Sequence, residues 1–315
     1  VITLGRGDPD LPTPRHISPD DIRKDFSKAM SDMYREEVPL YGALLELVAD
    51  TNARALASDP DLARQLQRTG EIQRLDMERH GAIRLGTALE LATISRLFAV
   101  MGMHPVGYYD LTPAGVPVHS TAFRAVHESA LQTSPFRVFT SLLRLELIEN
   151  LELRAFAEAA LGKRSIFTPR ALALIEQAEA DGGLNANDAQ AFIQQDLENF
   201  RWHHTATVSA AQYQQLSAQH RLIADVVAFK GPHINHLTPR TLDIDRVQAD
   251  MPGKGITPKA VIEGPPRRQC PILLRQTSFK ALDEAIAFTD ATGSHSARFG
   301  EIEQRGAALT PKGRA

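Results

Sequence analysis

The sequence predicts an α+β fold in which a large helical part carries a smaller β-sheet. Amphipathic helical patterns dominate the N-terminal and middle regions, whereas runs rich in Val, Tyr, Thr, Gly and Pro lie at residues 105–123 and after residue 231. A last run, residues 298–306, alternates charged or polar residues with apolar ones, as a strand with one polar face does. The chain therefore divides into a mainly helical region, residues 1–230, and a sheet region, residues 231–315.

Local signals at helix ends predict the individual elements. Ser18 and Pro19 fit the N-cap and first position of a helix, and Thr87 with Glu90 fits a capping box. Thr168-Pro169 starts another helix, which Gly182-Gly183 ends. The predicted helices cover residues 19–33, 40–56, 59–67, 87–100, 169–182, 210–229 and 279–288.

Composition narrows the class of protein. Hydrophobic residues make up 43% and charged residues 23% of the 315 residues, which is typical of a soluble globular protein. The formal net charge is −3, and no run approaches a transmembrane length, so neither a nucleic-acid nor a membrane partner is predicted. Cys270 is the only cysteine, which excludes an internal disulfide and a cysteine-based metal site and favours the cytoplasm. The start has no signal-peptide pattern, and we expect both ends to be trimmed.

The block Glu-Arg-His-Gly-Ala-Ile-Arg at residues 78–84 is the first candidate for a site. His80 and Arg84 are four residues apart, so they share a face in a helix and also in a strand. Gly81 between them allows another backbone or a ligand to come close. A lone histidine beside an arginine is more often a partly exposed surface pair, so this block needs support from elsewhere.

A second block, residues 231–240, contains His233 and His236. Pro232 and Pro239 oppose a helix here, and in a strand the two histidines face opposite sides. At most one of them then faces a given cavity. Taken alone, the block is slightly more often structural than metal-binding.

The alternating run at residues 298–306 supplies the acidic groups. Glu301, Glu303 and Arg305 point to one side of the predicted strand, and two enclosed carboxylates need a cation. One histidine from each of the two earlier blocks and one glutamate give a set that suits non-haem Fe(II), with open positions for a chelating substrate and O₂. Zn²⁺ could use the same ligands for hydrolysis, so the set does not fix the metal. A nearby arginine suits a carboxylate substrate.

Long blocks of the chain resemble the 2-oxoadipate dioxygenase/decarboxylase family, whose members are also called hydroxyglutarate synthases. The blocks are residues 26–46, 78–86 (ERHGAIRLG), 100–124, 233–245 (HINHLTPRTLDID) and 298–314 (RFGEIEQRGAALTPKGR). The resemblance implies an open β-sheet around a metal, similar to the vicinal oxygen chelate enzymes. It implies that His80, His236 and Glu301 bind Fe(II) and that Arg84 holds the substrate. His236 is preferred over His233 because it lies in NHLTPR. Glu301 is preferred over Glu303 because related dioxygenases end in a similar strand, although both glutamates share a face.

The implied reaction converts 2-oxoadipate and O₂ to 2-hydroxyglutarate and CO₂, in lysine degradation. Two other functions stay open on the residues alone: a divalent-metal hydrolase or lyase acting on a dicarboxylate, and a dicarboxylate sensor without turnover. Family members run further past residue 314, so we expect this chain to lack a C-terminal portion. Nothing in the sequence indicates the oligomeric state.

Overall fold

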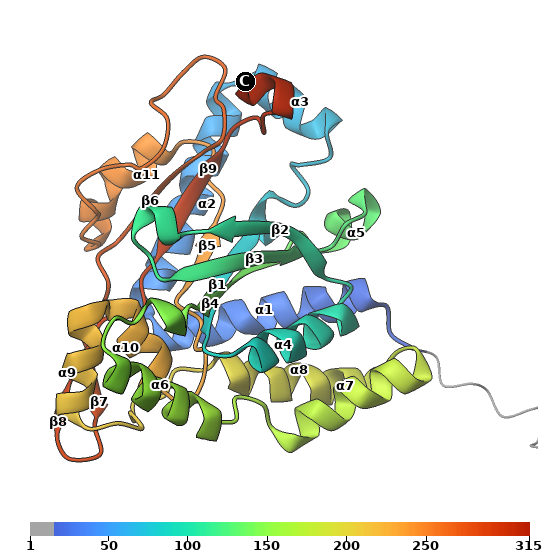
Figure 1. Ribbon diagram of the computed structural model, residues 1–315. Helices are drawn as coiled ribbons and strands as arrows, with labels where there is room; N and C mark the ends of the chain where they lie inside the picture. Colours follow the sequence, from blue (N-terminus) through green and yellow to red (C-terminus); the bar gives the residue numbers. More distant parts are fainter. Residues whose placement is uncertain (1–15) are drawn as a thin grey trace, which may run out of the picture.

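A computed structural model describes residues 16–315 of the chain. Its centre is a five-stranded sheet with the strand order β2-β3-β4-β1-β5 (Figure 1). The strands are β1 Arg79–Leu85, β2 His104–Asp110, β3 Val118–Arg124, β4 Arg137–Leu143 and β5 His236–Pro239. Strand β1 runs parallel to β4, and the other neighbouring pairs are antiparallel. The prediction of strands at residues 105–123 is confirmed, whereas the signal-peptide prediction concerns residues outside the described range.

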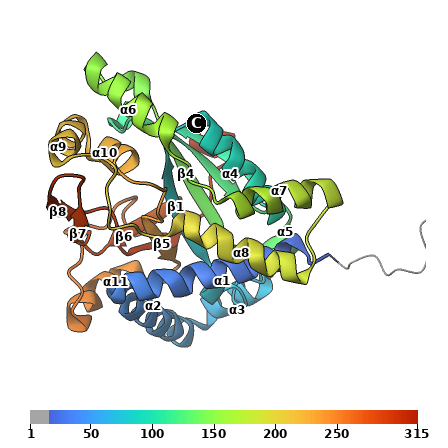
Figure 2. The ribbon, with the colours of Figure 1, turned by 90° about the horizontal axis from the view of Figure 1, so that it is seen from below.

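Helices cover one face of this sheet. Helices α1, α4 and α8 lie against it, and α1 and α8 run side by side (Figures 1 and 2). Their apolar side chains, including Phe26, Phe98 and Phe192, pack with Ile83 and Val138 of the sheet in one buried core. The helices are α1 Pro19–Glu37, α2 Pro39–Ser58, α3 Pro60–Arg68, α4 Ala88–Val100, α5 Glu128–Thr133, α6 Leu151–Lys163, α7 Pro169–Asp181, α8 Ala186–Phe200, α9 Ala210–Gln219, α10 Arg221–Val227, α11 Ile244–Asp250 and α12 Pro311–Arg314.

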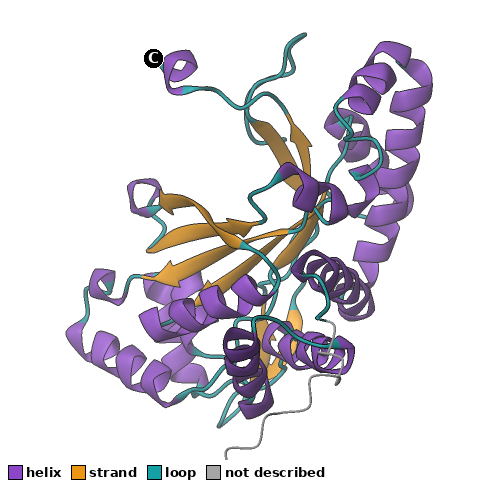
Figure 3. Ribbon diagram, turned by 90° about the vertical axis from the view of Figure 1, so that its right-hand side faces the viewer, coloured by secondary structure: helices purple, strands orange, loops and turns teal. Residues whose placement is uncertain are grey.

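The side chains of β1 alternate between the two faces of the sheet, which shows which residues lie on the face opposite the helices. Gly81, Ile83 and Leu85 point to the helical core, so His80, Ala82 and Arg84 share the other face. A two-stranded ribbon of β6 Leu274–Ser278 and β9 Glu301–Arg305 contacts β5 at the edge of the sheet (Figure 3). A second ribbon joins β7 Glu284–Ala287 to β8 Thr292–His295. The predicted α+β class, with a large helical part and an open sheet, is confirmed.

Several helix ends lie where the sequence predicted them. Ser18 accepts a hydrogen bond from the Asp20 N–H, and Thr87 and Glu90 form the predicted capping box. Gly182 follows α7 with a φ of +74°, which favours glycine. Among residues 16–315, no helix is long and apolar enough to span a bilayer.

Two predicted elements differ from the structure, and one strand was not predicted. The single helix expected at residues 210–229 is two helices, because His220 is extended and its side chain caps α10 by accepting from the Leu222 N–H. The helix expected at residues 279–288 is absent from the described chain: residues 284–287 form β7, whose pairing with β8 overrides the local pattern. Strand β4 was not predicted, although its residues alternate between buried and partly exposed positions over most of their length.

Candidate functional site

The structure brings His80, His236 and Glu301 to the same edge of the sheet. His236 pairs with Ala82 and Thr238 pairs with His80 in the antiparallel β1–β5 register, so both histidines are on the open face. Their ring centroids are 5.6 Å apart. The Nδ1 atom of His236 lies 3.8 Å from Oε1 of Glu301. These three residues come from β1, β5 and β9, which are far apart in the sequence.

Glycines allow these segments to approach closely. A Cβ atom at Gly81 would lie 3.0 Å from Cδ1 of Ile234. A larger residue at this position would therefore force β1 and the segment before β5 further apart. A Cβ atom at Gly300 would overlap the Phe279 ring. The small residue before Glu301 therefore lets the start of β9 pack against Phe279 and fixes where the carboxylate lies.

Both histidines are neutral and leave one ring nitrogen free. Burial lowers the pKa of His80, and burial together with the charge of Arg84 lowers the pKa of His236 to about 3. From their partners we assign Nδ1–H of His80 to Glu303, at 3.4 Å, and Nδ1–H of His236 to the Thr238 hydroxyl, at 2.9 Å. Neither Nε2 atom has a hydrogen-bond partner among residues 16–315. A neutral imidazole with a free nitrogen is the form that binds a metal.

The two glutamates of β9 have different partners. Glu301 accepts one hydrogen bond, from the Thr238 hydroxyl at 3.2 Å, and burial raises its pKa. Glu303 is contacted by Arg137 at 2.5 Å and by Arg305 at 2.7 Å. Burial alone would raise the pKa of Glu303, but the His80 hydrogen bond and the two guanidinium charges hold it well below its usual value. The charge of Glu303 is thus already balanced, whereas that of Glu301 is not.

This donor set fits a divalent cation. The described chain supplies two neutral imidazoles with free nitrogens and one buried carboxylate to which it offers no cationic partner, which is the donor set of a two-histidine, one-carboxylate site. The hydrogen bonds from His80 to Glu303 and from His236 to Thr238 are of the kind that orients histidine ligands. The three ligand atoms do not all lie within 4.8 Å of one another, so the described site is more open than a preformed cage.

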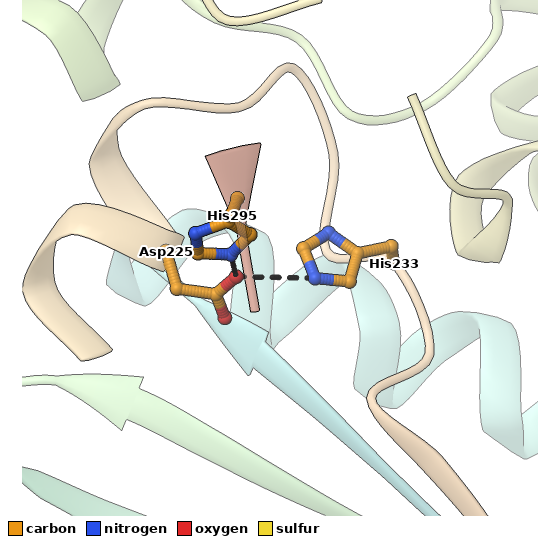
Figure 4. Close-up of side chains that lie close together, drawn as sticks. All are labelled: Asp225, His233 and His295. Carbon is orange, nitrogen blue, oxygen red and sulfur yellow. Dashed lines mark hydrogen bonds and ion pairs between the residues drawn. The ribbon is translucent and has the colours of Figure 1, made fainter. Parts of the chain in front are cut away.

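A second group of two histidines and a carboxylate lies on the other side of the segment that contains His236. Asp225 of α10, His233 and His295 of β8 are buried, and their ligand atoms lie within 4.8 Å of one another (Figure 4). Nε2 of His295 is 2.7 Å and Nε2 of His233 is 3.1 Å from Oδ1 of Asp225. His233 and His236 therefore face opposite sides, as the strand interpretation predicted.

Arg84 connects the open face of the sheet to this second group. Its Nη1 atom lies 2.5 Å from Oδ2 of Asp225, and its side chain is 26% exposed. Burial would raise the pKa of Asp225, but His233, Arg84 and the hydrogen bonds keep it well below its usual value. Asp225 is therefore an anion that is fully enclosed by donors.

Sequence reasoning did not identify three residues of the site. Arg137 of β4 is the register partner of His80. The alternating pattern of the β4 residues could have indicated where Arg137 lies. Thr238 lies within the NHLTPR block that was examined only for its histidines. Asp225 had no local signal, because only the tertiary fold brings α10 to Arg84.

The comparisons with known proteins concern the family of the chain. The model of the 2-oxoadipate dioxygenase/decarboxylase family matches residues 26–315. A Pseudomonas putida protein described as 2-oxoadipate dioxygenase/decarboxylase is 70% identical over 307 residues, which are 96% of this chain and 66% of the relative. A Mycobacterium bovis protein with the same description is 44% identical over 93% of this chain and 72% of its own length. The chain thus spans about two thirds of the length of its Pseudomonas relative.

Solved structures show the same fold. The crystal structure of the hydroxyglutarate synthase in complex with 2-oxoadipate from Pseudomonas putida is 71% identical, with a TM-score of 0.92 over 95% of this chain and 67% of that one. A putative glyoxalase superfamily protein from Ralstonia eutropha JMP134 is 17% identical, with a TM-score of 0.67 over 97% of this chain and 89% of that one. The second likeness concerns the fold alone.

Proposed function

This chain belongs to the 2-oxoadipate dioxygenase/decarboxylase family, and we propose that it uses Fe(II) to convert 2-oxoadipate and O₂ to 2-hydroxyglutarate and CO₂. The ligands in this proposal are His80, His236 and Glu301. The observation that carries it is the contrast on β9. Glu301 is buried beside two neutral histidines and has no cationic partner among residues 16–315, whereas Glu303 is balanced by Arg137 and Arg305.

Ferrous iron in this set would supply open positions for a 2-oxo acid and O₂ and the electrons for oxygen activation. The residues of the chain prepare the site. Burial keeps His80 and His236 unprotonated, and Thr238 orients Glu301 through its hydroxyl. The Phe139 ring, whose centroid is 4.5 Å from that of His80, restricts water on that side.

Arg84 is the proposed partner of a substrate carboxylate. It shares the open face with His80, and its planar guanidinium can pair with the distal carboxylate of 2-oxoadipate. Arg84→Ala should lower kcat/KM by several orders of magnitude, since losing a buried ion pair costs ~3–5 kcal/mol. Steady-state oxygen uptake measures this, and near-normal rates in the variant would exclude the role.

The balanced reaction gives a direct test. One O₂ is consumed for each CO₂ released; one oxygen atom enters the new carboxylate and the other the new hydroxyl group. The purified chain with Fe(II) and 2-oxoadipate should therefore take up oxygen and form 2-hydroxyglutarate that carries two labels from ¹⁸O₂. Absence of oxygen-dependent CO₂ release would refute the proposal. Consumption of the substrate without oxygen would instead support a metal hydrolase or lyase, and binding without turnover would support a sensor.

The remaining parts of the proposal follow from the substrate. 2-Oxoadipate places the enzyme in lysine degradation, and the single cysteine, Cys270, is in keeping with the cytoplasm. Both are proposals for this chain. The proposed partners are the 2-oxo dicarboxylate and O₂.

A further inference from the structure

Asp225 accepts three hydrogen bonds and has a fourth polar group against it. Nε2 of His295 donates to Oδ1, and Nη1 of Arg84 and Nδ2 of Asn235 donate to Oδ2, the latter at 3.4 Å. Nε2 of His233 lies 3.1 Å from Oδ1. The Tyr213 hydroxyl lies 2.6 Å from Nδ1 of His295, so it donates there and leaves Nε2–H for Asp225. With three hydrogen bonds and a guanidinium against it, this carboxylate is balanced without a metal.

Arg84 uses only part of its donor capacity in this contact. An arginine has five N–H donors, and among residues 16–315 the only hydrogen bond of the Arg84 side chain goes from Nη1 to Asp225. The remaining donors belong to a guanidinium that is held at Nη1 by a buried carboxylate. Asp225 is itself fixed by histidines, and Trp202 and Phe229 pack on both histidine rings.

We propose that Asp225 is a positioning residue that aims Arg84 at the distal carboxylate of the substrate and thereby sets the preference for dicarboxylic over monocarboxylic 2-oxo acids. This inference rests on the function proposed above. The buried histidines hold Asp225, Asp225 holds Arg84, and Arg84 presents its free N–H groups on the open face. Among residues 16–315, Asp225 makes no hydrogen bond or ion pair with His80, His236 or Glu301, so its effect on the site passes through Arg84.

The test compares the binding of 2-oxoadipate with that of 2-oxohexanoate, which lacks the distal carboxylate. Anaerobic calorimetry on the metal-loaded chain gives the ratio of the two dissociation constants. Asp225→Asn should reduce the preference for 2-oxoadipate by about 10- to 100-fold, the usual effect of removing a group that orients a binding residue. In an Arg84→Ala background, Asp225→Asn should change the ratio no further, because its effect passes through Arg84.

Glu90→Gln is the matched control. Glu90 and Arg164 form another buried ion pair, with side chains 8% and 7% exposed, and neither contacts Arg84. This variant should lose stability but keep the preference ratio. If Asp225→Asn does not fold, Tyr213→Phe removes the hydroxyl that fixes His295 and should lower the ratio in the same direction by a smaller factor.

Three outcomes would overturn the inference. An unchanged ratio in Asp225→Asn or Tyr213→Phe would reduce the cluster to a structural role. Loss of metal on substitution of His295, with retention in His80 variants, would make the cluster the metal site. Failure of the parent chain to bind 2-oxoadipate at all would refute the proposed function together with this inference, and the parent measurement alone distinguishes that case.

Discussion

Two groups of this protein contain the same ligand types, two histidines and one carboxylate, on opposite sides of the segment between His233 and His236. In one, Asp225 accepts three hydrogen bonds, one of them from Arg84, and His233 lies against it at 3.1 Å. In the other, Glu301 accepts one, and the free nitrogens of His80 and His236 have no partner in the described chain. Residue type alone therefore does not distinguish the two groups, whereas unused hydrogen-bonding capacity and unbalanced charge do.

The largest effect is expected from Glu301→Gln. Glu301 is the charged member of the proposed ligand set, and among residues 16–315 it has no cationic partner. The affinity for Fe(II) should therefore fall by more than the 10- to 100-fold typical of groups that merely orient ligands. Anaerobic Fe(II) titration and metal content after dialysis measure this. The stability of the metal-free chain should hold, because the variant removes a buried charge that lacks a counter-charge.

The control for this prediction is His295→Gln in the other group. It breaks a hydrogen bond to Asp225 but should leave the iron affinity near that of the parent chain. Retention of metal by Glu301→Gln together with its loss from His295→Gln would exchange the roles assigned to the two groups.

Glu303→Gln should show the reverse pattern. Without this carboxylate, Arg137 and Arg305 lie close together with less counter-charge, so the free energy of unfolding should fall by ~3–5 kcal/mol. The metal should stay, with affinity reduced about 10- to 100-fold because His80 loses its orienting partner. Urea unfolding and Fe(II) titration together test this. If Glu303→Gln abolished binding while Glu301→Gln did not, Glu303 would be the ligand.

The sequence predicted the fold class and much of the local structure because the signals were local. Capping residues located α1, α4 and α7, and the alternation in residues 301–305 located β9. The sequence did not predict the break at His220 or the strand at residues 284–287, because both depend on contacts made only in the folded chain. Local propensity cannot report such contacts.

The site divides in the same way. The spacing of His80 and Arg84 placed both on one face before the strand was known, and the three-residue spacing of His233 and His236 separated them correctly. The roles of His80, His236, Glu301 and Arg84 stay predictions that the experiments above address. The link from Arg84 to Asp225 spans 141 residues of sequence, so no window of the sequence could show it.

The smallest expected effect comes from a third buried carboxylate, Asp196 of α8. It is the extreme case in the comparison of how many hydrogen-bond donors each buried carboxylate has. Asp225 has three hydrogen-bond donors and Glu301 has one, but neither oxygen of Asp196 has a hydrogen-bond partner among residues 16–315. Burial alone raises its pKa well above the usual value, so the folded state holds the proton more tightly than the unfolded state. Its contribution to stability is therefore complete below the unfolded pKa of about 3.9 and is lost as the pH rises toward the folded pKa.

Asp196→Asn removes this titration and should be more stable than the parent chain at pH 8. The gain should be about 1–3 kcal/mol, the usual cost of a buried polar group without a partner, and it should shrink at pH 5. Urea unfolding of both proteins at the two pH values measures the difference. A gain that is equal at pH 5 and pH 8 would mean that Asp196 does not titrate in this window. A loss at pH 8 would mean that the carboxylate is paired in solution, and that donor count, the basis for separating Asp225 from Glu301, does not rank the buried acids of this protein.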